Sequence, residues 1–337
     1  QQLMNLEKSM KKIVIAMISI LIIFPLQVAA AVDYEISNYY IHADIEKNGD
    51  LKVTELIVLD GEFEGYIRDI VYKNTALNNS NYQNNIIYNA SDIEIIDISA
   101  KKVNNISFEN IFDTNYTSLI KGQANNYGYL ENSISNGKSY KMFYQSSGES
   151  VAFKLTYLIK DVIVLHNDVA EIYWTFIGND YADDIKNLEI RVNLPDKDNS
   201  DKFRVWAHGD LNGDIHKYDG YLIAKIERLS AYNTLDIRST FDNKLMNEEL
   251  VSKNSNDNAF QEVLKVEEER AMVANKERKK IKIIYYTFFS LSLVWYITLI
   301  IIWIKIYVKY DKEYKKSFQA KYYREFIEDY NVEVIDY

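Results

Sequence analysis

The stretch that most constrains the fold is an uncharged apolar segment near the C-terminus. Residues 283–304 read IIYYTFFSLSLVWYITLIIIWI and hold no charged side chain over 22 positions. A helix of this length spans the hydrocarbon core of a bilayer, which is about 30 Å thick, and globular helices are seldom apolar on every face for so long. Tyr285, Tyr286 and Trp303 lie near its ends, where aromatic side chains favour the membrane interface. We therefore expect one transmembrane helix, with the lipid bilayer as a partner of the chain.

A second, shorter apolar run lies near the N-terminus. Two lysines precede the run at 13–24, and Pro25 and three consecutive alanines follow it. This order is typical of a secretory signal peptide, and the run is too short to span a bilayer. We expect a signal peptide region at 1–31, with Met10 as the start and cleavage after Ala31. An uncleaved signal anchor is the alternative.

The charges beside the membrane segment leave its orientation open. Lysine and arginine are equally numerous on the two flanks of 283–304, with seven on each side, so the positive-inside rule does not decide. The predicted signal peptide at 1–31 decides the orientation instead, because it would export residues 32–282 and leave 305–337 inside. We expect a single-pass protein of the cell membrane, with its N-terminal domain outside and its C-terminus in the cytoplasm.

Composition excludes several classes of function. The chain has no Cys, which excludes disulfides, thiolate catalysis and cysteine-based zinc sites. Its formal net charge of −10 argues against a nucleic-acid partner, because phosphate contacts need a basic surface. The 28 Tyr and 14 Phe argue against disorder and supply a core. We expect no cofactor.

The region between the two apolar segments has the pattern of short strands. Apolar and polar residues alternate from Ile41 to Ile45, and Asn48-Gly49 is a pair that a two-residue hairpin turn prefers. Similar runs lie at 92–100, 140–145, 150–165, 169–178, 187–195, 204–209, 221–229 and 234–242. Many short strands indicate a mainly β fold. We expect an antiparallel β-sandwich-like domain over 32–242.

Turn and loop residues separate these runs. Asn-rich stretches at 73–91 and 104–126 indicate long loops or insertions. The predicted turns are Asn136-Gly137, Ser147-Gly148, Asn167-Asp168, Pro195-Asp196, Asn212-Gly213 and Asp219-Gly220. Their spacing favours antiparallel hairpins over helix–strand alternation.

Residues 243–282 differ from the β region in composition. They hold no Gly or Pro, and acidic residues precede basic ones, which suits the helix macrodipole. We expect a charged helical stalk that continues into the membrane helix. Phe260, Val263 and Leu264 form a short apolar stripe, so a coiled-coil dimer is an alternative.

Several stretches resemble one known family. EKNGDLKVTE and DGEFEGYIRDI lie within 46–70, and DVAEIYWTFIG occupies 168–178. AHGDLNG at 207–213 and LDIRSTF at 235–241 follow. Together they resemble the DUF2207 family of predicted membrane proteins, whose name records no function. Members of that family continue into further cytoplasmic sequence, so we expect the tail at 305–337 to be truncated.

Residues 208–216 contain a polar motif with two interpretations. Asp210, Asn212 and Asp214 have the D-x-N-x-D spacing of a calcium loop. Glycine and glutamate are missing from the positions that such a loop requires, which favours a polar hairpin turn. We expect no metal site, and we name His208 and Asp210 as candidate binding residues.

Arg68 is the third candidate binding residue. Strand alternation should fix its side chain, which could hold a ligand carboxylate or phosphate bidentately. Pairing with Asp69 or Glu64 is the alternative.

The carboxylates at 180–184 could act as a glycosidase pair, although an acidic solvated loop explains them as well. Ser and Lys at 135–138 match an acyl-enzyme motif, but Asn-Gly there predicts a turn.

These observations favour a binding or sensing module at the cell surface, with an unknown ligand or membrane protein as its partner. We expect no catalytic residue, because the sequence contains no G-x-S-x-G, H-E-x-x-H or phosphate-loop motif. The alternatives are a surface hydrolase that uses carboxylates and a structural subunit of a membrane assembly.

Overall fold

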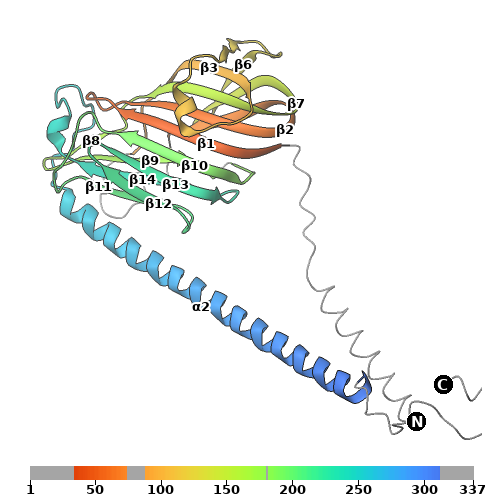
Figure 1. Cartoon of the computed structure of the whole chain (residues 1–337). Coiled ribbons are helices and arrows are strands. Elements are labelled where there is room, and N and C mark those ends of the chain that lie inside the picture. The colour runs from red at the N-terminus through yellow and green to blue at the C-terminus, as the bar shows by residue number, and fades with distance from the viewer. Residues whose placement is uncertain (1–33, 74–87, 180, 312–337) are drawn as a thin grey trace, which may run out of the picture. The chain divides into compact units, whose positions relative to one another are not determined.

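The computed structural model describes residues 34–73, 88–179 and 181–311 (Figure 1). The chain divides into a compact unit that ends at Ala271 and a second unit that begins at Met272. We call the described part of the first unit the β domain. The predicted signal peptide and most of the predicted cytoplasmic tail lie outside the described residues, so both stay predictions.

The larger sheet is built around two long strands that pair along most of their length. β2 has 21 residues and β7 has 23, and apolar side chains alternate along both. Within the described residues this sheet has ten strands in the order β12-β13-β10-β1-β2-β7-β3-β4, with β6 beside β7 and β5 beside β6. The strands are β1 (Tyr34–Ile45), β2 (Leu51–Val71), β3 (Ile93–Val103), β4 (Thr117–Ser118), β5 (Ile120–Lys121), β6 (Gly128–Ile134), β7 (Gly137–Ile159), β10 (Ile185–Asn193), β12 (Asp214–Tyr218) and β13 (Tyr221–Leu229).

A smaller sheet packs against the larger one and closes the core. Its order is β11-β14-β9-β8 in the described part of the chain. Ile41 and Ile190 of the larger sheet and Ile172 and Ile237 of the smaller one are fully buried in a single cluster, and Figure 1 shows the two layers. The predicted mainly β, sandwich-like fold is confirmed. The strands are β8 (Val164–Leu165), β9 (Ala170–Ile177), β11 (Arg204–His208) and β14 (Leu235–Phe241).

Strand pairing is mixed rather than wholly antiparallel. β1 and β10 run parallel, as do β5 and β6. β9 belongs to the smaller sheet, so the chain crosses between the sheets before β10 and can then run alongside β1 in the same direction. The crossover residues lie just after β9, and they become important for the candidate site.

The first hairpin is present, but its predicted turn is wrong. The loop between β1 and β2 comprises residues 46–50, five instead of two. Gly49 has a φ of 91°, whereas Asn48 is not among the residues with positive φ. The Asn48 amide Nδ2 donates to Asp50 Oδ2 at 2.9 Å, and Asp50 N donates to Asn48 Oδ1 at 3.2 Å. These side-chain bonds stabilise the longer loop.

Two other turns also differ from their predictions. Ser147-Gly148 is no turn, because β7 continues through it with Gly148 at a φ of 105° and a register shift opposite β2. A second register shift follows between Phe63 and Gly65, and the two strands remain paired on either side. Irregularities of this kind typically bend a strand. Asn136-Gly137 is displaced by one residue, since β7 already begins at Gly137. A Cβ there would meet the Ile70 carbonyl oxygen at 2.1 Å, so this close approach requires glycine.

The outer face of the larger sheet carries a small second core. The 3-10 helix η2 (Phe108–Phe112) lies in the stretch predicted as a long loop. Its Phe108 packs with Tyr40, Leu56 and Val58. This insertion covers part of the outer face of β1 and β2.

The predicted stalk is helical only in its later part. Residues 243–259 form the 3-10 helix η3 (Asn243–Leu245) and irregular structure whose Met246 and Val251 are buried in the main core of the β domain. Apolar side chains at these positions favour packing over an independent helix. The helix α2 (Phe260–Ile306) begins where Asp168 Oδ2 accepts a hydrogen bond from Phe260 N at 3.1 Å.

Helix α2 contains the predicted membrane segment. Among the described residues it is the one helix that is long and apolar enough to cross a membrane. All side chains of residues 283–304 are exposed to solvent in the isolated chain, as a lipid-facing helix requires. A short π-helical turn, η4 (Tyr307–Asp311), follows. The expectation of one C-terminal transmembrane helix is confirmed at the level of a candidate span.

Candidate functional site

The second half of β2 carries the residue that sequence reasoning singled out. Tyr66, Arg68 and Ile70 are buried, while Ile67 between them is 54% exposed. Successive side chains of a strand point to opposite faces, so this alternation directs Arg68 into the core of the sandwich. Its exposure is 4%, and a guanidinium at that depth needs a partner for its charge.

The partner of Arg68 is Glu55, from the first half of the same strand. Arg68 Nε donates to Glu55 Oε2 at 2.8 Å, and Arg68 Nη2 donates to Oε1 at 2.7 Å. The hydroxyls of Tyr39 and Tyr157 each donate to Glu55 at 2.6 Å. Arg68 Nη1 also donates to the Asp69 carbonyl. The bidentate geometry that we assigned to a ligand is therefore made within the protein.

The directions of the pKa shifts favour the ionised form of this pair. Burial acts to raise the pKa of Glu55, but the charge and hydrogen bonds of Arg68 and the tyrosine hydroxyls outweigh it, so that pKa is lowered. Burial acts to lower the pKa of Arg68, and the charge of Glu55 outweighs it. Burial also raises the pKa of Tyr39, which keeps its hydroxyl a donor. Neither Asp69 nor Glu64, the predicted partners, takes the place of Glu55.

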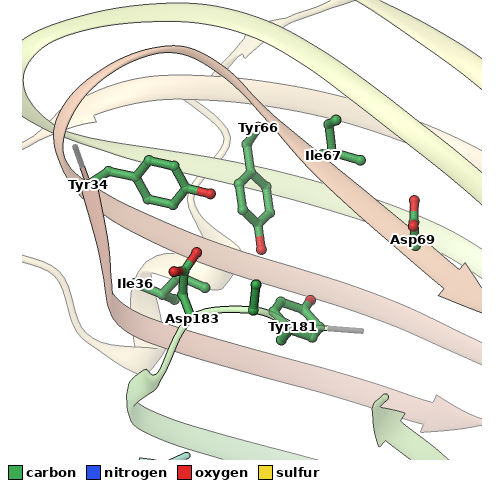
Figure 2. Close-up of a pocket in the computed structure, with 8 residues that line it drawn as sticks. Tyr34, Ile36, Tyr66, Ile67, Asp69, Tyr181 and Asp183 are labelled. Atoms are coloured by element: carbon green, nitrogen blue, oxygen red, sulfur yellow. The ribbon is translucent and has the colours of Figure 1, made fainter. Parts of the chain in front are cut away.

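Two open pockets adjoin this buried pair and share Asp69 in their walls. One has a volume of about 190 Å³ and is shown in Figure 2; we call it the tyrosine pocket. The other, of about 210 Å³, lies between the two sheets; we call it the inter-sheet pocket. Residues of the tyrosine pocket include Tyr34, Tyr66, Asp69, Tyr181, Ala182 and Asp183. Residues of the inter-sheet pocket include Arg68, Asp69, Asn136, Tyr157, Trp174 and Thr175.

Hydroxyl groups connect the tyrosine pocket with the buried pair. Tyr66 is hydrogen-bonded to Tyr181, and the Tyr181 and Tyr39 hydroxyl oxygens are 3.0 Å apart. Figure 2 shows the Tyr66 hydroxyl directed toward Tyr181. Since Tyr39 bonds to Glu55, these hydroxyls form a continuous chain from the pocket wall to the core. Such a chain holds the pocket rings in fixed orientations.

The acidic residues at 180–184 separate into different environments. Asp183 lines the tyrosine pocket and is hydrogen-bonded to Tyr34. Asp184 accepts from Ala231 N at 2.8 Å and pairs with Arg228. The Ala231 backbone bond is the main cause of its lowered pKa. Asp180 lies outside the described residues. The structure thus places Asp183 in the same pocket as Tyr181, whose ring lies 5.4 Å from Arg68 Cζ, although Asp183 and Arg68 belong to separate sequence motifs.

A second buried charge centre was missed by sequence reasoning. Arg238 Nε donates to Glu171 Oε1 at 2.7 Å, and Arg238 Nη1 donates to Glu267 Oε1 at 2.8 Å. His166 Nε2 lies 3.0 Å from Glu171 Oε2. The side chains of these four residues are at most 1% exposed. Glu267 belongs to α2, so the centre fastens the first turns of that helix to β9 and β14.

His208 belongs to this second centre. Its Nε2 lies 3.2 Å from Glu267 Oε2, and Arg270 Nη1 donates to the Tyr173 hydroxyl at 3.1 Å. Burial lowers the pKa of Arg238 to about 10. Burial acts to raise the pKa of Glu267, but the bonds and charges of His208 and Arg238 outweigh it and lower that pKa. The position of His208 thus supports a role in holding the helix.

Asp210 makes contacts of a different kind. Its Oδ2 accepts from Ser230 N at 2.9 Å, and its Oδ1 accepts from the Asn233 amide. Asn212 Nδ2 donates to the Arg228 carbonyl at 3.0 Å. These bonds tie the loop before β12 to the end of β13 and to the loop that follows it. Among the described residues no group of three or more His, Asp or Glu is arranged to hold a metal ion.

Known proteins resemble the chain at two levels. The family described as "Predicted membrane protein (DUF2207) N-terminal domain" matches residues 35–241. No curated protein matches the chain. Solved structures that match part of the chain include leukotriene A4 hydrolase from Saccharomyces cerevisiae, at 7% identity and a TM-score of 0.39; the match covers 62% of this chain and 29% of that one. An M1 zinc metallopeptidase from Deinococcus radiodurans matches at 8% identity and a TM-score of 0.30. That match covers 61% of this chain and 42% of the peptidase chain.

This chain therefore corresponds to less than half the length of either enzyme. At these TM-scores neither likeness carries an argument about function.

Proposed function

Because the chain belongs to the DUF2207 family of predicted membrane proteins, we propose that it is a single-pass membrane protein whose β domain binds a ligand outside the cell. The candidate span in α2 supports the anchoring. The leader at 1–31 supports an outside β domain and a cytoplasmic C-terminus. The ligand site of this proposal is the tyrosine pocket, with the inter-sheet pocket beside it.

The observation that carries the proposal is the buried Arg68–Glu55 pair next to open pockets. A buried ion pair adds little stability over apolar residues of similar size, because both charges lose their hydration. Here the pair fixes the tyrosines that lead to the pocket wall. A site whose rings are held in place before binding loses less entropy when a ligand arrives.

A further contact supports a sensing role. Thr175, a residue of the inter-sheet pocket, donates its hydroxyl to Asp236 Oδ1 at 2.6 Å. Burial raises the pKa of Asp236, and the charges of His208 and Arg270 act against that rise. Those two residues contact Glu267 of α2. We propose that occupancy of the pockets is transmitted to α2 along this route. A measured coupling between the pockets and α2 is what would establish that transmission.

The test uses the full chain in uncharged detergent micelles and a panel of small molecules and surface-polymer fragments. Ala182→Trp places an indole in the tyrosine pocket from an exposed loop position, so the fold should be retained. Ala207→Trp adds the same group at an exposed site outside the described pockets. A compound whose binding is lost only in Ala182→Trp supports the proposal. If every bound compound is unaffected by Ala182→Trp, the proposed site is wrong.

A surface hydrolase is the second candidate, because Asp69 and Asp183 line one pocket. A glycosidase needs one carboxyl group as the acid and a second as nucleophile or base. Incubation of the chain with surface glycans, with Asp183→Asn as the control, tests this. Turnover that disappears in Asp183→Asn would favour hydrolysis over binding alone.

A further inference from the structure

We propose that the tyrosine pocket binds an organic ammonium group, either as a small free cation or as the head of a larger molecule. This inference rests on the proposed function, since it names the ligand class of the same pocket.

The charged residues of the pocket favour a cation. The Asp183 carboxylate faces the space between Tyr34 and Tyr66 (Figure 2), and Asp69 lines the same pocket. Among the described residues no Lys or Arg lines it. The Arg68 guanidinium lies behind one of the pocket rings, with its Cζ 5.4 Å from the centre of the Tyr181 ring. Glu55 balances that charge, so the carboxylates decide the sign of the local potential.

The aromatic rings provide a second attraction for a cation. Ring faces carry negative charge density and attract ammonium groups, most strongly where water is excluded. The rings of Tyr34 and Tyr66 are 6.3 Å apart at 87°, so they present differently oriented surfaces to the pocket. The hydroxyls of Tyr66 and Tyr181 bond to each other. The rings are thus held in place, and their faces are the surfaces that attract a cation.

Size and donor set distinguish an organic cation from a metal ion. The volume of about 190 Å³ is below the roughly 300–1,000 Å³ typical of pockets for drug-sized ligands. It suits one substituted ammonium head. Calcium needs six or more oxygen ligands, and no group of three or more acidic or histidine side chains is arranged for a metal in the described part of the chain.

The test is a calorimetric titration of the full chain in dodecyl maltoside micelles, which carry no ammonium group. The probes are choline and its uncharged isostere, in which carbon replaces the quaternary nitrogen. We expect choline to bind about tenfold more tightly or better, because only the cation gains the electrostatic attraction. A second pair of probes is a short-chain phosphatidylcholine and glycerol phosphate, which lacks the ammonium group. This pair tests whether the bound ammonium group belongs to a lipid or to a free amine.

Variants assign the effect to the pocket. Asp183→Asn should raise the Kd for choline about tenfold, because it removes the facing carboxylate. Glu64→Gln removes the same charge from an exposed position on β2 outside the described pockets, and it should leave the Kd unchanged. Circular dichroism of each variant confirms folding. Tyr34→Phe removes the hydroxyl bound to Asp183 but keeps the ring, so it should retain choline binding.

The outcomes separate this inference from the proposed function. Equal affinity for choline and its isostere, or an unchanged Kd in Asp183→Asn, overturns the ammonium inference. The proposed function survives that result if another compound is displaced by Ala182→Trp. Tight binding of the phosphatidylcholine with no binding of glycerol phosphate supports the inference with a lipid as the source. Binding of glycerol phosphate that equals choline binding overturns it.

Discussion

Two arginines are buried in the β domain, and they are paired in different ways. Arg68 has one carboxylate partner, Glu55, on its own strand, and tyrosine hydroxyls complete that carboxylate's bonds. Arg238 has two carboxylate partners, Glu171 on β9 and Glu267 on α2. The Arg68 centre lies beside pockets, whereas the Arg238 centre joins a helix to a sheet.

The difference concerns what remains when the arginine is removed. Without Arg68, Glu55 keeps two neutral donors and can take up a proton. Without Arg238, two carboxylates face each other in a site from which water is excluded. Removing one partner of a buried pair costs more than the pair contributes, because an uncompensated charge is left. The two centres should therefore differ in cost and in the part of the chain that responds.

Arg238→Met should have the largest effect. We expect a loss of about 5 kcal/mol, at the upper end for broken buried pairs, since Glu171 and Glu267 both lose the buried cation that they share. Arg270, which stays beside Glu267, is 35% exposed and compensates little. Hydrogen exchange of the full chain in micelles should show lost protection at amides 260–271, where α2 meets the β domain. Retained protection at those amides would show that this centre does not fasten the helix.

Arg68→Met should cost less, about 3 kcal/mol, because Glu55 keeps the hydroxyls of Tyr39 and Tyr157. The loss of protection should be confined to β2 and its neighbours, and amides 260–271 should stay protected. Ligand binding at the tyrosine pocket should weaken as the rings lose their fixed positions. A cost above that of Arg238→Met would reverse the comparison.

Tyr157→Phe removes one hydrogen bond from the first centre without removing a charge. We expect a loss of about 1.5–3 kcal/mol in the free energy of unfolding, the range for bonds to charged groups. Tyr140→Phe is a matched control on the same strand, because the Tyr140 hydroxyl is buried and has no hydrogen-bond partner among the described residues. Its removal should be neutral or stabilising. Equal losses in the two variants would contradict the importance of the bond to Glu55.

Lowering the pH should change the contributions of the two buried charge centres to stability in different ways. The pKa of Glu55 is lowered below its ordinary 4.5, so its contribution is present above pH 4.5 and is lost as pH falls below it. In the second centre Glu267 behaves in the same way, but burial raises the pKa of Glu171. The contribution of Glu171 is present below pH 4.5 and is lost as pH rises through its folded-state pKa.

Stability near β2 should therefore fall between about pH 5 and pH 3. The loss should be about 1.4 kcal/mol for each unit by which folding lowers the pKa of Glu55. Stability near α2 should change less, because its two carboxylates act in opposite directions. Hydrogen exchange corrected for intrinsic rates measures both regions in one sample. In Glu55→Gln the acid dependence near β2 should disappear, and its persistence would assign that dependence to another group.

Sequence patterns predicted the elements better than the contacts between them. Alternation placed Arg68 inside a strand and 283–304 in one helix, because these depend on local periodicity. Glu55 lies 13 residues before Arg68, and Glu267 lies 29 residues after Arg238. The first pair forms only because β2 bends between its two members, since 13 residues of straight strand would hold them about 40 Å apart. The second forms only through the docking of α2, and one sequence specifies neither. An Arg in an apolar strand was the available sign, and LDIRSTF contained one that we did not single out.

The smallest predicted effect is at the rim of the second centre, and it tests whether burial or charge holds the helix. Arg270 Nη1 lies 3.1 Å from Glu267 Oε1, three residues earlier on α2, but the Arg270 side chain is 35% exposed. Water and salt screen such a pair, so Arg270→Ala should cost only about 0.3–1 kcal/mol. Arg270→Lys keeps the charge and should cost less still.

Both variants should leave most of the protection at amides 260–271, because Arg238 still neutralises the buried carboxylates. Added salt should abolish the difference between wild type and Arg270→Ala while leaving the Arg238→Met defect intact, since ions reach the rim but not the core. If Arg270→Ala instead released the helix as fully as Arg238→Met, the distinction between a buried fastening and an exposed rim would be lost. The attachment of α2 would then depend on the sum of its charges and not on where they lie.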